Sequence, residues 1–216
     1  ISYGHQGLAI AEKLNWKAGV VDAHRAIGVN HGFGKSEYSE SLAAFSKSLA
    51  AAVETGDQAD AAKALNNMGV VYWYLSDFPK AIEHYYKALQ IHEKMGNKVE
   101  MANSLSNIGL VYNSQEDYPK ASEYILKGNE LDKDLGNKTG IASNLGNIGQ
   151  IYAAMNNLPK ALEYDSSALA LYTELGDKNG IARNLGNMGG IYAEQGLYTK
   201  SLDHYTQALA ISKELG

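Results

Sequence analysis

The side chains that could carry out chemistry are few in this sequence, and they are poorly spaced for it. Six histidines are present, and none lies in a metal-binding spacing such as His-Glu-x-x-His. His24 and His31 are seven residues apart and could share a helical face, but two imidazoles without a third ligand make a weak metal site. His84 and His204 occupy the same position of an internal repeat, which accounts for both. We therefore expect no metal and no cofactor.

The segment from Gly32 to Ser36, Gly-Phe-Gly-Lys-Ser, ends like a phosphate-binding loop. Such a loop needs another glycine five residues before its Gly-Lys pair, where this chain has Val29, and it needs a preceding strand, which is not predicted. The paired glycines indicate a turn instead. The chain also has no cysteine and no Ser/His/Asp set, so we predict that it is not an enzyme.

Composition narrows the possible partners. The 216 residues carry 19 basic and 24 acidic side chains, a net charge of −5, without the basic clusters that bind phosphate, so no nucleic-acid partner is expected. No apolar run approaches the roughly 18 residues that cross a bilayer, so no membrane partner is expected. The absence of cysteine fits a reducing compartment, and we predict a cytoplasmic location. Because the first residue is not methionine, we expect a piece of a longer chain.

Many residue types recur every forty positions. Glycines recur at 56, 96, 136, 176 and 216, prolines at 79, 119 and 159, and tyrosines at 72, 112, 152 and 192. A spacing shared by so many residue types, with helical patterning inside each unit, is typical of a solenoid. Capping residues divide each unit into two helices, as where Gly136 ends one helix and Asn137 begins the next.

The repeat register predicts the organisation of the whole chain. We expect one domain, 1–216, of about eleven antiparallel helices and no strands. Residues 1–14 align with the second helix of a truncated repeat, and 15–55 form a degenerate repeat with one extra residue. The clear repeats are 56–95, 96–135, 136–175 and 176–215.

The repeated residues resemble those of a tetratricopeptide repeat (TPR) array. The first clear unit carries the pattern as Leu65, Met68-Gly69, Tyr72, Ala81, Tyr85 and Ala88. The forty-residue period is similar to that of the Leu-Gly-Asn adaptor proteins and kinesin light chains. The resemblance implies a right-handed α-α superhelix that acts as a protein-protein interaction scaffold. Similar arrays also accompany cyclases, histidine kinases and transcription regulators. An alternative is therefore a regulatory or self-associating module without a peptide ligand of its own.

One repeated residue is not explained by packing between paired helices. Asparagine recurs in the middle of the first helix of each clear unit, although its amide competes for backbone hydrogen bonds and disfavours helix. The recurrent residues are Asn67, Asn107, Asn147 and Asn187. The resemblance places them on the concave surface, where amides bind the backbone of an extended peptide. The alternative is that they hydrogen-bond to neighbouring helices and hold the superhelix together.

Other side chains are expected to flank these asparagines in a peptide-binding groove. Three of them are cations that would favour an acidic partner. The predicted flanking residues are Arg25, Lys63, Asn66, Tyr74, Asn103, Ser143, Gln150 and Arg183.

Two departures from the repeat carry expectations of their own. Asp165 stands where other units have Phe45, Tyr85 and Tyr205. Because burying an unpaired carboxylate is costly, we expect Tyr164 to take over the packing and Asp165 to reach water, with donors such as Arg183 or Asn184 as the alternative. At the C-terminal end, we expect Leu209 and Ile211 to form an exposed apolar strip that permits end-to-end self-association.

Overall fold

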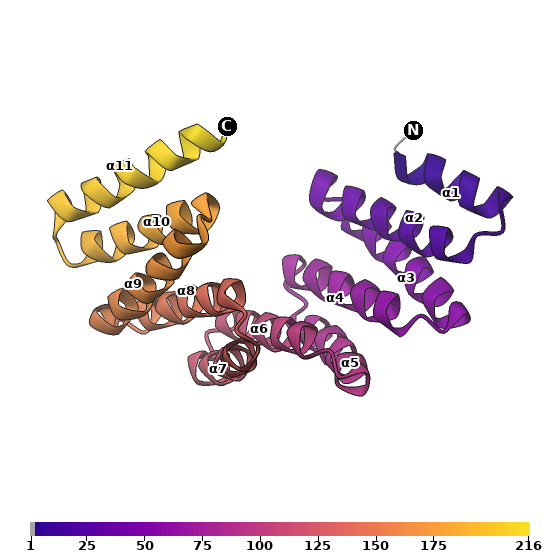
Figure 1. Ribbon diagram of the computed structural model, residues 1–216, viewed down its shortest axis with the longest axis horizontal. Coiled ribbons are helices and arrows are strands. Elements are labelled where there is room, and N and C mark those ends of the chain that lie inside the picture. Colours follow the sequence, from indigo (N-terminus) through magenta and orange to yellow (C-terminus); the bar gives the residue numbers. More distant parts are fainter. Residues whose placement is uncertain (1–2) are drawn as a thin grey trace. The chain divides into compact units, whose positions relative to one another are not determined.

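The computed structural model describes residues 3–216, except for the side chain of Phe33. These residues form eleven α-helices and one π-helical turn, and the described part of the chain contains no strand. The predicted all-α architecture is therefore confirmed. The elements are α1 (Tyr3–Lys13), α2 (Lys17–Val29), η1 (Asn30–Gly34), α3 (Tyr38–Thr55), α4 (Gln58–Tyr74), α5 (Phe78–Met95), α6 (Lys98–Ser114), α7 (Tyr118–Leu135), α8 (Lys138–Ala154), α9 (Leu158–Leu175), α10 (Lys178–Glu194) and α11 (Tyr198–Leu215) (Figure 1).

Local sequence signals set the ends of these helices. Asp77, Asp117 and Asn157 each accept a hydrogen bond from the backbone N–H three residues later, and a proline follows in the first turn, where its missing N–H is not needed. Gly96 ends α5 at φ 67°, a left-handed conformation that glycine adopts without a steric cost. The residues that recur every forty positions therefore include the caps.

The chain divides after Ser104, within α6, into two compact units. In each unit a helix packs against the helix that follows it, as α4 does with α5 and α8 with α9 (Figure 1). Phe45, Met68 and Val71 form part of the core of the first unit. Ile125 and Ile148 belong to that of the second. None of the described helices combines the length and the apolar character needed to cross a bilayer.

The extra residue of the degenerate repeat is accommodated differently from our expectation. We predicted a turn at the paired glycines, but α2 continues into the π-helical turn η1, which contains Gly32 and Gly34. The chain reverses only at Ser36, which has φ 58°. A π-helical turn contains one residue more than the corresponding α-helical turn, so it absorbs an insertion without ending the helix.

The expectation that Asp165 reaches water is wrong. Its side chain is 0% exposed. Asp165 follows Ala161 by four residues and precedes Ala168 by three, so the helical period places all three on the buried side of α9. Tyr164 lies on the neighbouring face and stacks on Tyr152 with ring centroids 5.3 Å apart. Helical geometry therefore keeps the carboxylate inside.

The apolar strip predicted on the last helix is confirmed for Leu209 but not for Ile211. Leu202 and Leu209 of α11 are 68% and 55% exposed, and Tyr205 is 46% exposed, although its counterparts Phe45 and Tyr85 are buried. Ile211 is half-buried.

Candidate functional site

The four recurrent asparagines lie at equivalent positions of α4, α6, α8 and α10, and all four are half-buried. Asn67 belongs to the first unit, and Asn107, Asn147 and Asn187 belong to the second. Within the second unit, Ser106 Oγ donates a hydrogen bond to Asn144 Oδ1 at 2.7 Å, which joins α6 to α8, and α8 contacts α10. Three neighbouring helices therefore carry an asparagine in the same register.

Within residues 3–216, the side-chain amides of these four asparagines form no hydrogen bond. Asn144 differs, although it is only three residues before Asn147. It is 3% exposed, and its Nδ2 donates to Asp132 Oδ2 at 2.9 Å. Three residues turn a helix through about 300°, so these two side chains lie about 60° apart around α8, with Asn144 buried and Asn147 at the half-buried edge of the same side.

In the second unit, the flanking residues predicted around the asparagines are accessible. Gln150 and Arg183 are exposed, and Ser143 is half-buried. Arg183 Nη2 donates to Tyr172 Oη at 2.6 Å, and its guanidinium carbon lies 5.7 Å from the centre of the tyrosine ring. No ion pair links Arg183 to any carboxylate in residues 3–216. Tyr172 thus holds the guanidinium in place without neutralising it.

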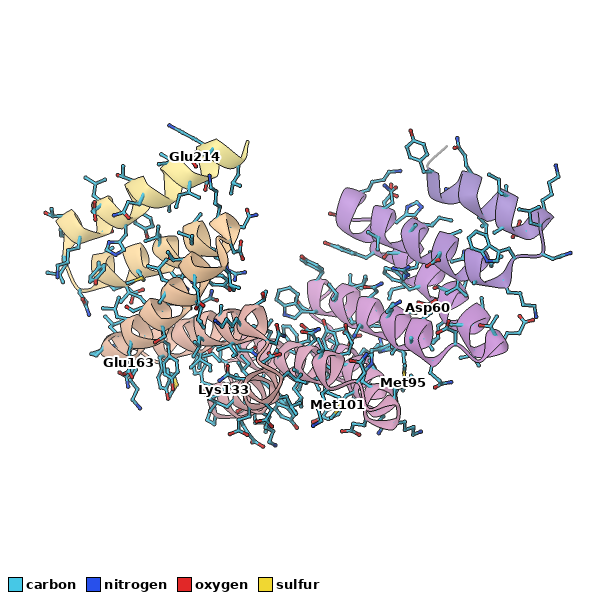
Figure 2. The ribbon with its side chains drawn as sticks, viewed as in Figure 1. Asp60, Met95, Met101, Lys133, Glu163 and Glu214 are labelled. Carbon is cyan, nitrogen blue, oxygen red and sulfur yellow. The ribbon has the colours of Figure 1, made fainter. Side chains whose placement is uncertain are left out.

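In the first unit, nearby carboxylates already pair with the predicted cations. Lys63 Nζ lies 2.8 Å from Asp60 Oδ1, and Arg25 forms an ion pair with Asp22 (Asp60 is labelled in Figure 2). These pairs reduce the attraction of the first unit for an acidic partner.

The uncharged flanking residues of the first unit have mixed surroundings. Asn103 Nδ2 donates to Glu100 Oε2 at 3.3 Å. Asn66 is half-buried, and its Oδ1 has no hydrogen-bond partner. Tyr74 is 53% exposed and stacks on Tyr38, with ring centroids 6.0 Å apart.

Sequence analysis missed a buried polar seam behind the asparagines of the second unit. Ser106 bonds to Asn144, Asn144 bonds to Asp132, and Asn137 Nδ2 donates to Asp132 Oδ1 at 2.7 Å. Burial raises the pKa of Asp132, while the bonds from Asn137 and Asn144 oppose that rise. The one sequence feature that accompanies this seam is Gly140. A larger residue would not fit there, because a Cβ atom would lie 2.3 Å from Asp132 Oδ2.

The next interface along the chain lacks this seam. Gly146 takes the place of Ser106, and Asn184 Oδ1 is buried without a partner. Both carboxylate oxygens of Asp165 also lack a hydrogen bond of normal geometry. Burial raises the pKa of Asp165 to about 7, and the nearby Asn184 amide offsets only part of the rise.

Three of the histidines have neighbours that the structure describes. The rings of His84 and His204 lie 5.0 and 4.9 Å from those of Tyr72 and Tyr192, as their repeat position predicts. His31 Nδ1 lies 2.5 Å from Glu37 Oε2. Among the described residues, no group of three or more histidine or carboxylate side chains is arranged to hold a metal ion.

Comparison with known proteins identifies this architecture. The tetratricopeptide repeat family model matches residues 20–94, 60–134 and 140–214. The chain belongs to the tetratricopeptide repeat family. No curated protein matches this TPR chain in sequence.

Solved structures share the TPR fold at low sequence identity. BtubC (BKLC) from P. vanneervenii has a TM-score of 0.81 and 18% identity, over 98% of this chain and 89% of that chain. A Rap protein complexed with competence and sporulation factor has a TM-score of 0.79 and 16% identity, over 90% of this chain and 54% of that chain. A kinesin light chain-like repeat protein of Podospora anserina has a TM-score of 0.68 and 11% identity, over 90% and 96%.

Proposed function

We propose that this chain is a protein-interaction scaffold that binds a peptide segment along the first helices of its repeats. The observation that carries the proposal is the state of Asn107, Asn147 and Asn187. These side chains are half-exposed and lie in one register on three neighbouring helices. An amide offers one donor group and one acceptor, the same pair that a peptide bond presents. A row of such amides suits the backbone of an extended ligand.

Two structural neighbours with this fold were solved as complexes. One is a Rap protein in complex with competence and sporulation factor, and another is a Rap conjugation gene regulator in complex with the Phr* peptide, with a TM-score of 0.79 and 15% identity. Identity this low supports a shared fold alone. The proposal therefore rests on the asparagines of this chain.

The flanking residues suggest which ligand side chains are selected. Arg183 has no carboxylate partner in the described chain, whereas Lys63 and Arg25 are already paired. We therefore assign any preference for an acidic residue in the ligand to Arg183, beside Ser143 and Gln150. In the first unit, Asn66, Asn67, Tyr74 and Asn103 would form a second contact region. We place this activity in the cytoplasm, with no catalytic step.

The test is selection of ligands from a displayed library of random dodecapeptides, followed by affinity measurement on variants. The combined variant N107A/N147A/N187A should lose binding to the selected peptides at least tenfold. A matched control is S167A/Q207A, which changes two exposed polar residues on α9 and α11. Equal affinity of the wild-type chain and the asparagine variant would overturn the proposal, and failure to select any peptide would favour the regulatory alternative.

A further inference from the structure

The first unit contains a cavity where several repeat positions depart from the pattern. It has a volume of about 300 Å³ and lies between α1, α2 and α3, with apolar walls that include Leu8, Ile27 and Ala44. In the next repeat, the position of Ala44 is taken by His84, whose ring centroid lies 5.0 Å from that of Tyr72. Because alanine replaces that ring in the degenerate repeat, the space of the ring is left open.

A lysine at this cavity has lost the partner that its counterparts have. Lys87 and Lys127 pair with Glu83 and Glu123 one turn earlier, with N–O distances of 2.5 and 2.6 Å. The corresponding residue before Lys47 is Ala43. Lys47 lines the cavity, and no ion pair of it is formed in the part of the chain that the structure describes. The substitution that removes the glutamate therefore leaves an ammonium group available.

A carboxylate stands at the same cavity. Glu40 also lines it, at the position where the next repeat has Lys80. Lys80 pairs with Asp77 at 2.6 Å, but Glu40 forms no ion pair with any described residue. The cavity therefore has one unpaired charge of each sign.

His24 adds an uncharged polar group to the lining. His24 lines the cavity where the clear repeats have a leucine such as Leu65. Burial and then the nearby Lys47 ammonium lower the pKa of His24, and Glu12 opposes them, while His5 lowers it slightly further. At neutral pH, His24 therefore adds an N–H donor and a lone pair without adding a charge.

The spacing of the two charges suits a ligand that carries both signs. Glu40 and Lys47 are seven residues apart in α3, which corresponds to about 10.5 Å along the helix axis. The ammonium and carboxylate of an α-amino acid are about 3 Å apart, and a charge-assisted hydrogen bond of about 2.8 Å at each end gives a total of about 9 Å.

We propose that this cavity is a binding site for a free α-amino acid with an apolar side chain. Glu40 receives the ammonium group, Lys47 receives the carboxylate, and the apolar side chain enters the cavity against Leu8, Ile27 and Ala44. The site lies in the first unit and does not depend on peptide binding by the recurrent asparagines.

Isothermal titration of the whole chain with L-phenylalanine at pH 7 tests the site. Phenylalaninamide lacks the carboxylate and N-acetylphenylalanine lacks the ammonium, and each should bind about fivefold more weakly, the size expected for an exposed ion pair. Glycine, which cannot fill the cavity, should give no measurable binding. No binding of L-phenylalanine, or equal affinity for all three phenylalanine compounds, would overturn the proposal.

Variants test whether Lys47 binds the carboxylate of the ligand and Glu40 its ammonium group. Lys47→Gln should weaken L-phenylalanine binding and remove the preference over phenylalaninamide, and Glu40→Gln should remove the preference over N-acetylphenylalanine. Ala43→Glu supplies Lys47 with the partner that Lys87 has, so it should also weaken binding. Lys87→Gln, the matched change in the next repeat, should leave the affinity unchanged. These residues are exposed, and circular dichroism checks that each variant folds. A Lys47→Gln variant that still prefers the free acid over the amide would contradict the assignment.

Discussion

Two asparagines three residues apart in α8 differ in what surrounds them. Asn144 is buried and gives Asp132 one of its two side-chain donors, whereas Asn147, about 60° away around the helix, is only half-buried. A buried carboxylate that loses a donor retains its desolvation penalty without the compensating bond. An asparagine with no internal bond costs the helix only its poor propensity. Identical residue types therefore have opposite expected effects on stability.

Alanine substitution separates these roles. We expect Asn144→Ala to lower the free energy of unfolding by about 2 kcal/mol, because the buried Asp132 Oδ2 loses a hydrogen-bond donor and the bond from Ser106 Oγ to Asn144 is lost. Asn147→Ala should leave it unchanged or raise it by about 0.5 kcal/mol through helix propensity. Urea denaturation followed by circular dichroism measures both. A loss of more than about 1 kcal/mol for Asn147→Ala would indicate that the recurrent asparagines hold the helices together.

The buried Asp165 predicts a dependence of stability on pH. Burial raises its pKa in the folded chain to about 7 from an ordinary value of 3.8, so between these values the folded state binds a proton that the unfolded state has released. The contribution of Asp165 to stability is therefore present at low pH and is lost as the pH rises toward 7. Over that range we expect a loss of a few kcal/mol.

Denaturation at several pH values checks this assignment. Asp165→Asn should unfold with a free energy that falls less steeply between pH 4 and pH 7 than that of the wild-type chain. Glu163→Gln, an exposed change on the same helix, should keep the wild-type slope. Identical slopes for the wild-type chain and Asp165→Asn would show that another group causes the dependence.

At the scale of a helix, some glycines are required by close packing, whereas others could be replaced to stabilise the helix. A Cβ atom on Gly180 of α10 would lie 2.2 Å from Tyr172 Cδ1, whereas nothing lies within 4 Å of one on Gly186. Ion pairs at the open ends of the helix pairs contribute less. Lys138 pairs with Glu174 at 2.5 Å and Lys178 with Glu214 at 2.7 Å (Glu214 is labelled in Figure 2), but all four side chains are more than half exposed.

These two glycines give a matched pair of substitutions within one helix. Gly186→Ala should raise the free energy of unfolding by up to about 1 kcal/mol, because alanine favours helix and meets no neighbour. Gly180→Ala should lower it despite the same gain in propensity, because the buried Tyr172 ring cannot move aside. Thermal denaturation distinguishes the two variants. If both stabilise the chain, the packing of Tyr172 against α10 is wrong.

At the scale of the whole molecule, the sequence predicts the fold well because the same features determine both. The caps and the apolar period recur every forty residues in the clear repeats, and aligning residues 1–55 with them extends the prediction to about eleven helices without strands. The residues that depart from the repeat were harder to predict. The burial of Asp165 follows from helical position rather than from its charge, and the seam from Ser106 to Asp132 joins three helices.

The candidate site was predictable in part. Repeat register places Asn107, Asn147 and Asn187 on equivalent helices, and it indicates that Arg183 lies nearby. Register alone does not reveal that Asp60 pairs with Lys63, because the rotamers of two long side chains decide that contact. The repeat boundaries and the peptide contacts stay predictions.

The central claim is that the recurrent asparagines serve recognition. The most direct measurement is the NMR signal of the asparagine side-chain amides during titration with a peptide selected on the chain. The signals of Asn107, Asn147 and Asn187 should shift with peptide concentration, while those of the buried Asn144 and Asn184 should stay in place. Shifts confined to other residues, with the recurrent asparagines unchanged at saturation, would contradict the account.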